Sequence, residues 1–278
     1  MRWLARVVVL LLLPAVLTAQ PPAAAPAPDG VMLAFSRFAD IFGSRLVAAF
    51  EAIPAARYDY RPTPAQQTVG YVAQHLEDAN YSLCERLVGQ LGDARAATAP
   101  RRPASASDSL ADTVKARWPK DTLVARLRAS LGFCHAALDR VSHPSAADAH
   151  TLLAFETDLA EHYSQIAVYM RLLGLVPPSA LPPAPRTAVA LPVAELARYA
   201  GRYRLAQGLE LEVTLRDGAL VARSNVGGGP VPLWPEGGSA FFAREADVQI
   251  TFTRDAAGAV TGLVLHQYGR DRPGRKLR

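Results

Sequence analysis

A proline-rich segment divides the sequence into two parts with different hydrophobic periods. The segment "VPPSALPPAPRTAVALP" spans residues 176–192, and its prolines favour a semi-rigid, extended backbone. Before it, apolar residues recur at steps of three and four, which is typical of helices. After it, apolar and polar residues alternate, which is typical of strands. The sequence therefore predicts an α+β protein of two domains, with residues 176–192 as the linker.

The part before the linker predicts four amphipathic helices. In the first, the apolar residues share one face and Pro54 ends the helix: Phe35, Phe38, Phe42, Leu46, Phe50 and Ile53. Thr68 can cap the second helix, and the third and fourth span about 121–141 and 147–175. Helices of this length pack economically as an antiparallel up-down four-helix bundle, here over residues 31–175.

The part after the linker, residues 193–278, predicts antiparallel hairpins. Leu211, Val213 and Leu215 alternate with polar residues, and "RDG" then offers a tight turn into "ALVARS". A second alternating run reaches "RDAAG" and returns as "AVTGLVLHQYG". We expect a small antiparallel β-sheet or barrel.

The first nineteen residues read as a secretory signal peptide. Arg2 and Arg6 form its basic start, Val7 to Leu17 its apolar core, and "LTA" a cleavage site before Gln20. The apolar run is short for a membrane span, and no cysteine follows it to carry a lipid. Residues 20–30 are rich in proline and alanine and predict a disordered leader. We expect an exported protein, periplasmic or extracellular, without stable membrane insertion after cleavage.

The charge distribution argues against a nucleic-acid partner. The whole chain has a net charge of +5. The signal peptide contributes +2 and residues 270–278 contribute +4, so the rest of the chain has a net charge of −1. A nucleic-acid-binding protein needs a basic stripe across its folded surface. The basic end of the chain is therefore interpreted as a solvated tail.

The only two cysteines, Cys84 and Cys134, fall on the predicted second and third helices. In an exported chain two cysteines are candidates for a disulfide. Two separate cysteines buried in the bundle core are the alternative. The sequence leaves both open.

Two segments of the helical part resemble a known family. "YDYRPTPAQQTVGYVAQHLEDANYSLC" and, later, "ETDLAEHYSQIAVYMRLLGLVPP" are similar to the DinB-like (damage-inducible) four-helix superfamily over roughly residues 31–178. The resemblance implies an up-down-down-up bundle that holds a divalent metal, usually with three histidines. His75 and His162 match two of them, and Asp158 stands in place of the third.

The residue types agree with a metal site. Asp158 and His162 are four positions apart and therefore share one helix face. Imidazole and carboxylate are ordinary ligands of Zn, Mn, Fe and Ni, and three ligands leave coordination positions open. Glu161 lies about a quarter-turn aside and is a weak candidate for a general base, while Tyr163 and Arg171 are expected to frame the pocket. The alternative is that His75 and His162 are interior histidines satisfied by hydrogen bonds, one of them paired with Asp158.

The C-terminal part, roughly residues 194–278, resembles a domain of unknown function that often follows beta-lactamase-like serine hydrolases. The similarity rests on "YAGRY" and on the hairpin "FTRDAAGAVTGLVLHQYG". No S-x-x-K nucleophile motif precedes it, so that activity does not transfer.

Two functional hypotheses follow. The first is an exported metal-dependent enzyme, a transferase or hydrolase, that performs thiol transfer or hydrolysis on a small molecule the sequence does not identify. The second is a non-catalytic envelope protein with a degenerate metal site that binds a partner. A homodimer is compatible with both.

Overall fold

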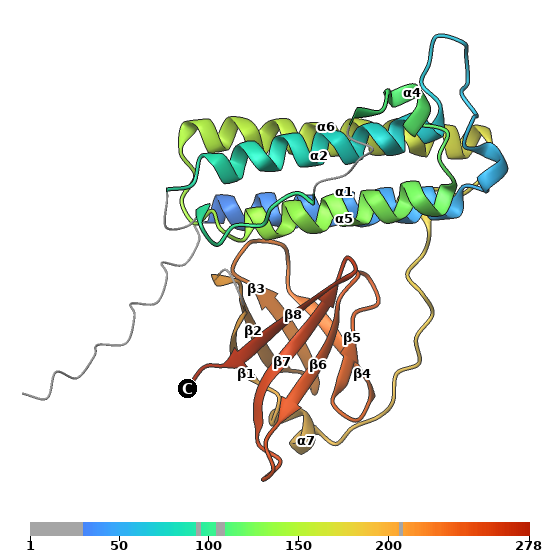
Figure 1. The fold of residues 1–278 in the computed structure, drawn as a ribbon. Helices are drawn as coiled ribbons and strands as arrows, with labels where there is room; N and C mark the ends of the chain where they lie inside the picture. The colour runs from blue at the N-terminus through green and yellow to red at the C-terminus, as the bar shows by residue number, and fades with distance from the viewer. Residues whose placement is uncertain (1–29, 93–95, 104–108, 206–207) are drawn as a thin grey trace, which may run out of the picture.

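The computed structural model describes residues 30–92, 96–103, 109–205 and 208–278. The expected signal peptide and all but the last residue of the expected leader lie outside this part of the chain. Within it, a helical bundle precedes a β-barrel, so the α+β architecture is confirmed (Figure 1). In the described residues no helix is both long enough and apolar enough to cross a membrane.

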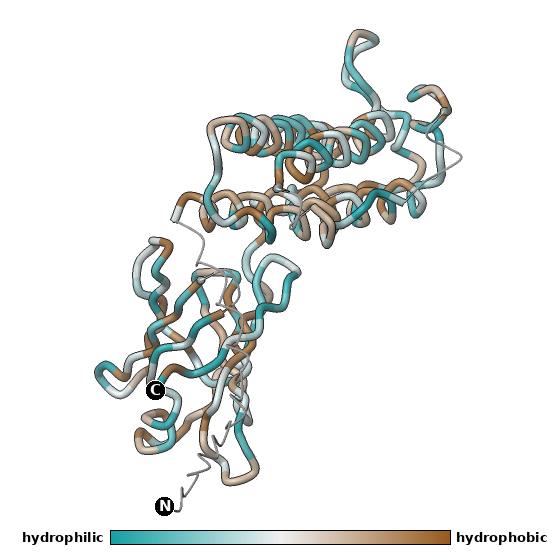
Figure 2. Tube along the Cα trace, turned by 60° about the vertical axis from the view of Figure 1, so that its left-hand side comes forward, coloured by the Kyte–Doolittle hydropathy of each residue, from teal (hydrophilic) through white to brown (hydrophobic). Residues whose placement is uncertain are grey.

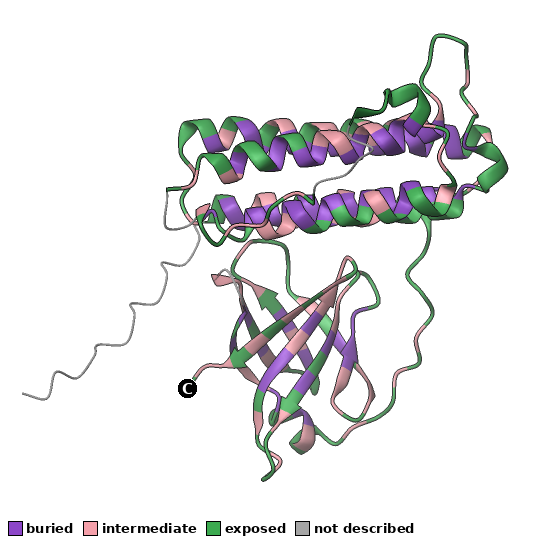
Figure 3. Cartoon of the chain, in the orientation of Figure 1, coloured by how far each residue is buried: buried purple, intermediate pink, exposed green. Residues whose placement is uncertain are grey.

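Four long helices form the bundle: α1 (Gly30–Ala52), α2 (Val69–Gly89), α5 (Lys120–Leu138) and α6 (Ala146–Leu172). Short helical turns join or follow them: η1 (Ala55–Arg57), α4 (Asp112–Lys115) and η3 (Pro178–Ala180). The predicted apolar faces meet in one core along the bundle axis (Figure 3). Phe38 is the exception: the sequence places it on the apolar face of the first helix, but its side chain is 51% exposed and stays outside the core.

Helices α2 and α5 run parallel. Glu77 in the first half of α2 pairs with Arg126 in the first half of α5, at 2.7 Å, and in the second half of both helices Cys84 is bonded to Cys134. The long connection after α2 must therefore return along the bundle before α5 begins. Helices α2 and α6 are antiparallel. His75 in the first half of α2 lies beside Asp158 in the middle of α6, whereas Gln90 at the end of α2 contacts Thr151 near the start of α6.

The direction of helix α1 follows from its contacts with α5. Lys120 at the start of α5 donates to the carbonyl of Ile53 just after α1, and His135 near the end of α5 reaches Asp40 in the middle of α1. Helices α1 and α5 are thus antiparallel, and the bundle runs up, down, down, up. This is the order implied by the resemblance, and it departs from strict alternation only at the long connection between α2 and α5.

The start of α2 is fixed by a side-chain cap and by a glycine. The Thr68 hydroxyl accepts a hydrogen bond from the Tyr71 backbone N–H at 3.1 Å, as the sequence predicts. Gly70 donates its own N–H to the Tyr58 carbonyl at 2.8 Å. A Cβ on Gly70 would lie 2.2 Å from the carbonyl oxygen of Ala116, so only glycine fits where the helix enters the bundle.

Helix α6 has a defined beginning and end. Ser145 and Asp148 form a capping box at its first turn. At the other end Gly174 has a φ of 73°, and the Leu175 N–H donates to the Met170 carbonyl at 2.8 Å. This left-handed glycine termination ends the helix just before the double proline.

The C-terminal domain begins with the short helix α7 (Val193–Ala197) and forms a closed antiparallel barrel. Its strands follow one another around the barrel: β1 (Gly201–Leu205), β2 (Glu210–Arg216), β3 (Ala219–Ser224), β4 (Val231–Gly237), β5 (Ala240–Phe242), β6 (Gln249–Arg254), β7 (Val260–Gln267) and β8 (Arg270–Lys276). The "RDG" turn adopts positive φ at Asp217 and Gly218, as a two-residue hairpin requires.

The interpretation of the basic end as a solvated tail is wrong. Residues Arg270–Lys276 form β8, which pairs with both β7 and β1 and closes the barrel. The sequence signal was the turn at Tyr268 and Gly269, both with positive φ, after which basic residues alternate along a strand. Closure removes the exposed edges that β1 and β7 would otherwise present.

The barrel lies against the layer of the bundle formed by α1 and α5, and the turned view shows the same arrangement (Figures 1 and 2). Asp40 of α1 is 1% exposed, and its carboxylate accepts hydrogen bonds from Arg270, at 3.0 Å, and from Arg272. Arg270 also reaches Asp139 after α5, at 3.8 Å. Charged side chains of β8 therefore fasten the barrel to the bundle.

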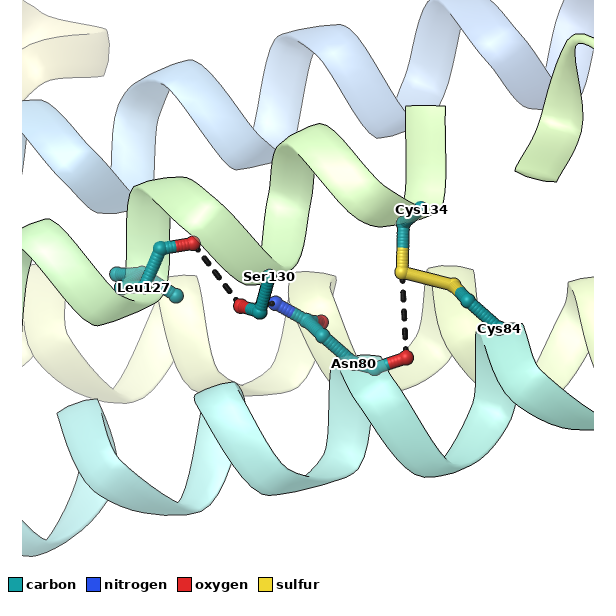
Figure 4. The surroundings of a disulfide bond; sticks show 5 residues. All are labelled: Asn80, Cys84, Leu127, Ser130 and Cys134. Atoms are coloured by element: carbon teal, nitrogen blue, oxygen red, sulfur yellow. Dashed lines mark hydrogen bonds between the residues drawn. A yellow bond between two sulfur atoms is a disulfide. The ribbon is translucent and has the colours of Figure 1, made fainter. Parts of the chain in front are cut away.

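Cys84 and Cys134 form a disulfide, which decides the question that the sequence leaves open. Their Cα atoms are 5.3 Å apart, within the range that such a bond requires. Next to it the Asn80 side chain donates to the Ser130 hydroxyl at 3.0 Å, and that hydroxyl donates to the Leu127 carbonyl at 2.9 Å (Figure 4). The bond joins the parallel helices α2 and α5 inside the core.

Candidate metal centre

The predicted ligand residues meet between α2 and α6. One oxygen of Asp158, Oδ1, lies 3.5 Å from Nε2 of His75 and 3.5 Å from Nε2 of His162. The three ligand atoms all lie within 4.8 Å of one another. The imidazole rings are 4.8 Å apart between centroids and inclined by 69°. Two imidazole nitrogens and a carboxylate oxygen therefore face one small volume.

A chain of hydrogen bonds fixes the tautomer of His162. The Tyr169 hydroxyl lies 3.1 Å from the Gln67 carbonyl, which can only accept, so the hydroxyl donates to it. The same hydroxyl accepts from Nε2 of Gln165 at 3.0 Å, which turns Oε1 of Gln165 toward His162. Nδ1 of His162, 2.9 Å from that oxygen, must then carry the proton. In the neutral imidazole, Nε2 of His162 then has its lone pair toward Asp158.

This tautomer makes a shared cation the natural occupant of the site. A lone pair on Nε2 and a carboxylate oxygen repel each other unless a positive charge lies between them. The distances of 3.5 Å are longer than good hydrogen bonds. In addition, Oδ2 of Asp158 is buried and has no hydrogen-bond partner in the described part of the chain. The donor set fits a divalent ion of the borderline class.

His75 is the most exposed of the three ligand residues. Its side chain is 36% exposed, against 20% for Asp158 and 15% for His162. The Asp158 carboxylate raises the pKa of the His75 imidazole, against the opposing effect of burial. The ring also stacks on Tyr71, one turn earlier on α2, with an angle of 7° between the rings. Solvent can therefore reach the centre from the side of His75.

A large open cavity lies beside this face. It measures about 1120 Å³ and is lined by Tyr71 together with the loop before α2 and the turn before α5, including Arg61, Trp118 and Lys120. Tyr71 thus belongs both to the cavity wall and to the surroundings of His75. A substrate in this cavity would have basic, acidic and aromatic side chains around it, since Asp59 and Asp121 also line the wall.

Other residues that the sequence suggested do not join the cluster. Glu161 is exposed on α6 and is not among the converging ligand groups. Tyr163 is buried toward α1, where its ring lies 6.2 Å from that of Phe42 and its hydroxyl accepts from the Ser179 N–H. Arg171 is exposed and donates to a carbonyl of its own helix. The expectation that Tyr163 and Arg171 frame the pocket is not met.

The supporting residues Gln165 and Tyr169 were missed at the sequence level. They lie three and seven positions after His162 and therefore continue the same helix face. That spacing was a usable signal. What it could not reveal is that the partner at the end of the chain of hydrogen bonds is a backbone carbonyl in a loop, that of Gln67.

The other histidines of the bundle lie outside the metal-ligand cluster. His143 and His150 are exposed. His135 is largely buried, with Nε2 3.2 Å from Asp40. Burial, and to a lesser extent the nearby Arg270 guanidinium, lowers the pKa of His135 to about 3, so this residue is neutral at neutral pH.

The similarity of this chain to solved structures is limited. One chain, described as "Crystal structure of SurE with D-Leu", matches with 26% identity over 44% of this chain and a TM-score of 0.29. The match spans only 28% of the length of that chain, and a structural similarity this low does not indicate a shared fold or function. No curated protein matches significantly.

Family models do match, and they divide the chain as the structure does. Residues 185–275 match a domain of unknown function (DUF3471), which corresponds to the end of the linker, α7 and the barrel. Residues 40–168 match the DinB superfamily, in which metal binding is common, and include His75, Asp158 and His162. The chain therefore joins a helical bundle that matches the DinB superfamily to a β-barrel that matches DUF3471.

Proposed function

We propose that this protein is an exported, divalent-metal-dependent hydrolase whose metal is held by His75, Asp158 and His162. The observation that carries the proposal is the arrangement of two imidazole nitrogens around one carboxylate oxygen, with Nε2 of His162 held as an acceptor. A bound divalent ion would supply Lewis acidity and lower the pKa of a coordinated water or thiol.

The chain's own residues would hold and orient the ligands. Gln165 keeps the proton on Nδ1 of His162, and Tyr169 anchors Gln165 to the backbone. Asp158 contributes the negative charge of the set. With a carboxylate in place of a third imidazole, the site is harder and favours manganese, iron or zinc over softer ions. The cavity beside Tyr71 would take the substrate.

The disulfide is the reason for preferring hydrolysis to thiol transfer. Structural disulfides persist mainly in oxidising compartments, where low-molecular-weight thiols are less dependable as substrates. This also supports export to the periplasm or the extracellular space. Thiol transfer remains the rival chemistry, and a non-catalytic binding protein is what remains if no metal binds.

Metal analysis of the purified mature protein tests the ligand set. The wild type should contain a stoichiometric divalent metal, and His162→Ala should lose it while the far-ultraviolet circular dichroism stays unchanged. His150→Ala is the matched control, because His150 lies exposed on the same helix and should keep the metal. Equal metal content in His162→Ala and the wild type would contradict the assignment.

Activity assays then separate the two chemistries. A panel of small ester and amide substrates should be hydrolysed by the metal-loaded wild type and not by His162→Ala, and chelation should abolish the activity reversibly. Turnover that requires an added small thiol, with no hydrolysis in its absence, would favour the transferase instead.

A further inference from the structure

The interior of the barrel holds a cavity at the end that faces α1. It measures about 220 Å³ and is lined mainly by inward-facing apolar side chains of the strands, among them Leu211, Ala222, Ile250 and Leu265. Leu33 and Asp40 of α1 form its outer wall. A barrel of eight strands has an interior of the size that can hold one small ligand.

The opposite end of the barrel is filled. Tyr199, Phe241 and Phe252 pack there with ring centroids 4.8 to 5.3 Å apart, and Tyr203 lies 5.5 Å from Phe252. Arg254 lies over the ring of Tyr199 and pairs with Glu195 of α7. A ligand would therefore enter and leave only from the end that faces α1.

The rim of the cavity carries a positive charge that no described residue balances. Three charged residues line it: Arg37, Asp40 and Arg272. Arg272 is already paired with Asp40. Arg37, half-buried on α1, has no hydrogen-bond or ion-pair partner among the described residues, and its Nη1 would lie 3.9 Å from a Cβ built on Gly228. One guanidinium thus remains free beside the glycine loop 227–229.

From this juxtaposition we infer that the barrel binds a monoanionic amphiphile, an aliphatic carboxylate whose chain fills the cavity and whose headgroup pairs with Arg37. A guanidinium recognises a carboxylate with two parallel hydrogen bonds. The volume exceeds that of a cavity of about 150 Å³ that binds benzene, so it admits a chain of about eight carbons. This site lies outside the metal centre and is independent of the proposed hydrolase activity.

Titration calorimetry with a series of straight-chain carboxylates tests the inference. The protein is treated with EDTA first, so that no carboxylate can bind through a metal. Affinity should rise about fourfold for each added methylene from hexanoate to octanoate, and should stop rising once the cavity is full. Octan-1-ol, with the same chain and no charge, should bind about tenfold more weakly than octanoate.

Variants locate the site. Arg37→Gln should weaken octanoate binding about tenfold and leave octan-1-ol unchanged, whereas Arg216→Gln, exposed at the far end of β2, should change neither. Ala222→Leu should fill the cavity and abolish binding of both. Val226→Trp, in the loop at the mouth, should do the same without disturbing a strand, and serves if Ala222→Leu does not fold.

Three results would overturn the inference. One is absence of octanoate binding to the wild type at millimolar concentration. Another is equal affinity for octanoate and octan-1-ol, which would show that Arg37 does not recognise the carboxylate. The third is full octanoate binding by both folded cavity variants, which would place the ligand elsewhere.

Discussion

The disulfide between Cys84 and Cys134 should account for a large share of the stability of the bundle. The bond closes a sequence separation of 50 residues that includes the return connection and most of α5. In the loop-entropy model, removing that constraint from the unfolded chain costs roughly 4 kcal/mol. Because α2 and α5 are parallel and joined only by a long connection, no short turn replaces the bond when it is broken.

The measurement is urea unfolding of the purified protein, followed by far-ultraviolet circular dichroism, with and without a reductant. With a slope of about 2 kcal/mol per molar urea, a loss of roughly 4 kcal/mol lowers the midpoint by about 2 M. The variant Cys84→Ala combined with Cys134→Ala should show a midpoint at least as low, because both sulfurs are buried and their loss leaves a small cavity.

The double variant is also the control, since reductant should not change its midpoint. Thiol titration of the denatured wild type without reductant should find no free thiol. Identical midpoints for the oxidised and the reduced wild type would refute the reasoning, and two free thiols in the protein purified without reductant would refute the bond itself.

Three further predictions concern the way the domains and helices are held. Asp40→Asn should leave Arg272 buried without its charge partner, at a cost of about 3–5 kcal/mol, and small-angle scattering should show the barrel detached from the bundle; an unchanged profile would count against the interface. Gly70→Ala should destabilise the bundle measurably in thermal unfolding, because its Cβ meets the backbone of Ala116; an unchanged midpoint would show that the backbone yields freely. Since the pKa of His135 is lowered to about 3 in the folded protein, the unfolded state binds the extra proton below about pH 6.5; stability should fall by about 2–3 kcal/mol between pH 7 and pH 4.5, and His135→Leu should remove that part of the pH dependence.

The sequence predicted the helices and strands well where local chemistry determines them. Thr68 caps α2, and the apolar alternation at Leu211 and Val213 gives β2. The convergence of His75 with Asp158 and His162 also followed from residue spacing together with the family resemblance. These features depend on a few neighbouring residues or on a shared motif.

Features that depend on distant residues were not predicted. The basic residues of β8 look like a solvated tail because their partner, Asp40, is more than two hundred residues away in the sequence. The state of Cys84 and Cys134 likewise depended on how closely their two positions on α2 and α5 approach each other, which the structure gives as 5.3 Å between Cα atoms. Neither hydrophobic periodicity nor composition contains that information, since both arise from the packing of whole elements.

Helix α1 belongs to the bundle by sequence, yet it also forms part of the wall at one end of the barrel. A barrel expressed alone, from α7 onwards, would present the apolar lining around Leu211 and Leu265 to solvent and leave Arg272 without Asp40. Such a fragment should self-associate at the uncovered end, although it contains every strand of its own sheet. We therefore expect that the linker is not a boundary of cooperative folding, and that the C-terminal domain depends for its stability on a helix that precedes it by more than a hundred residues.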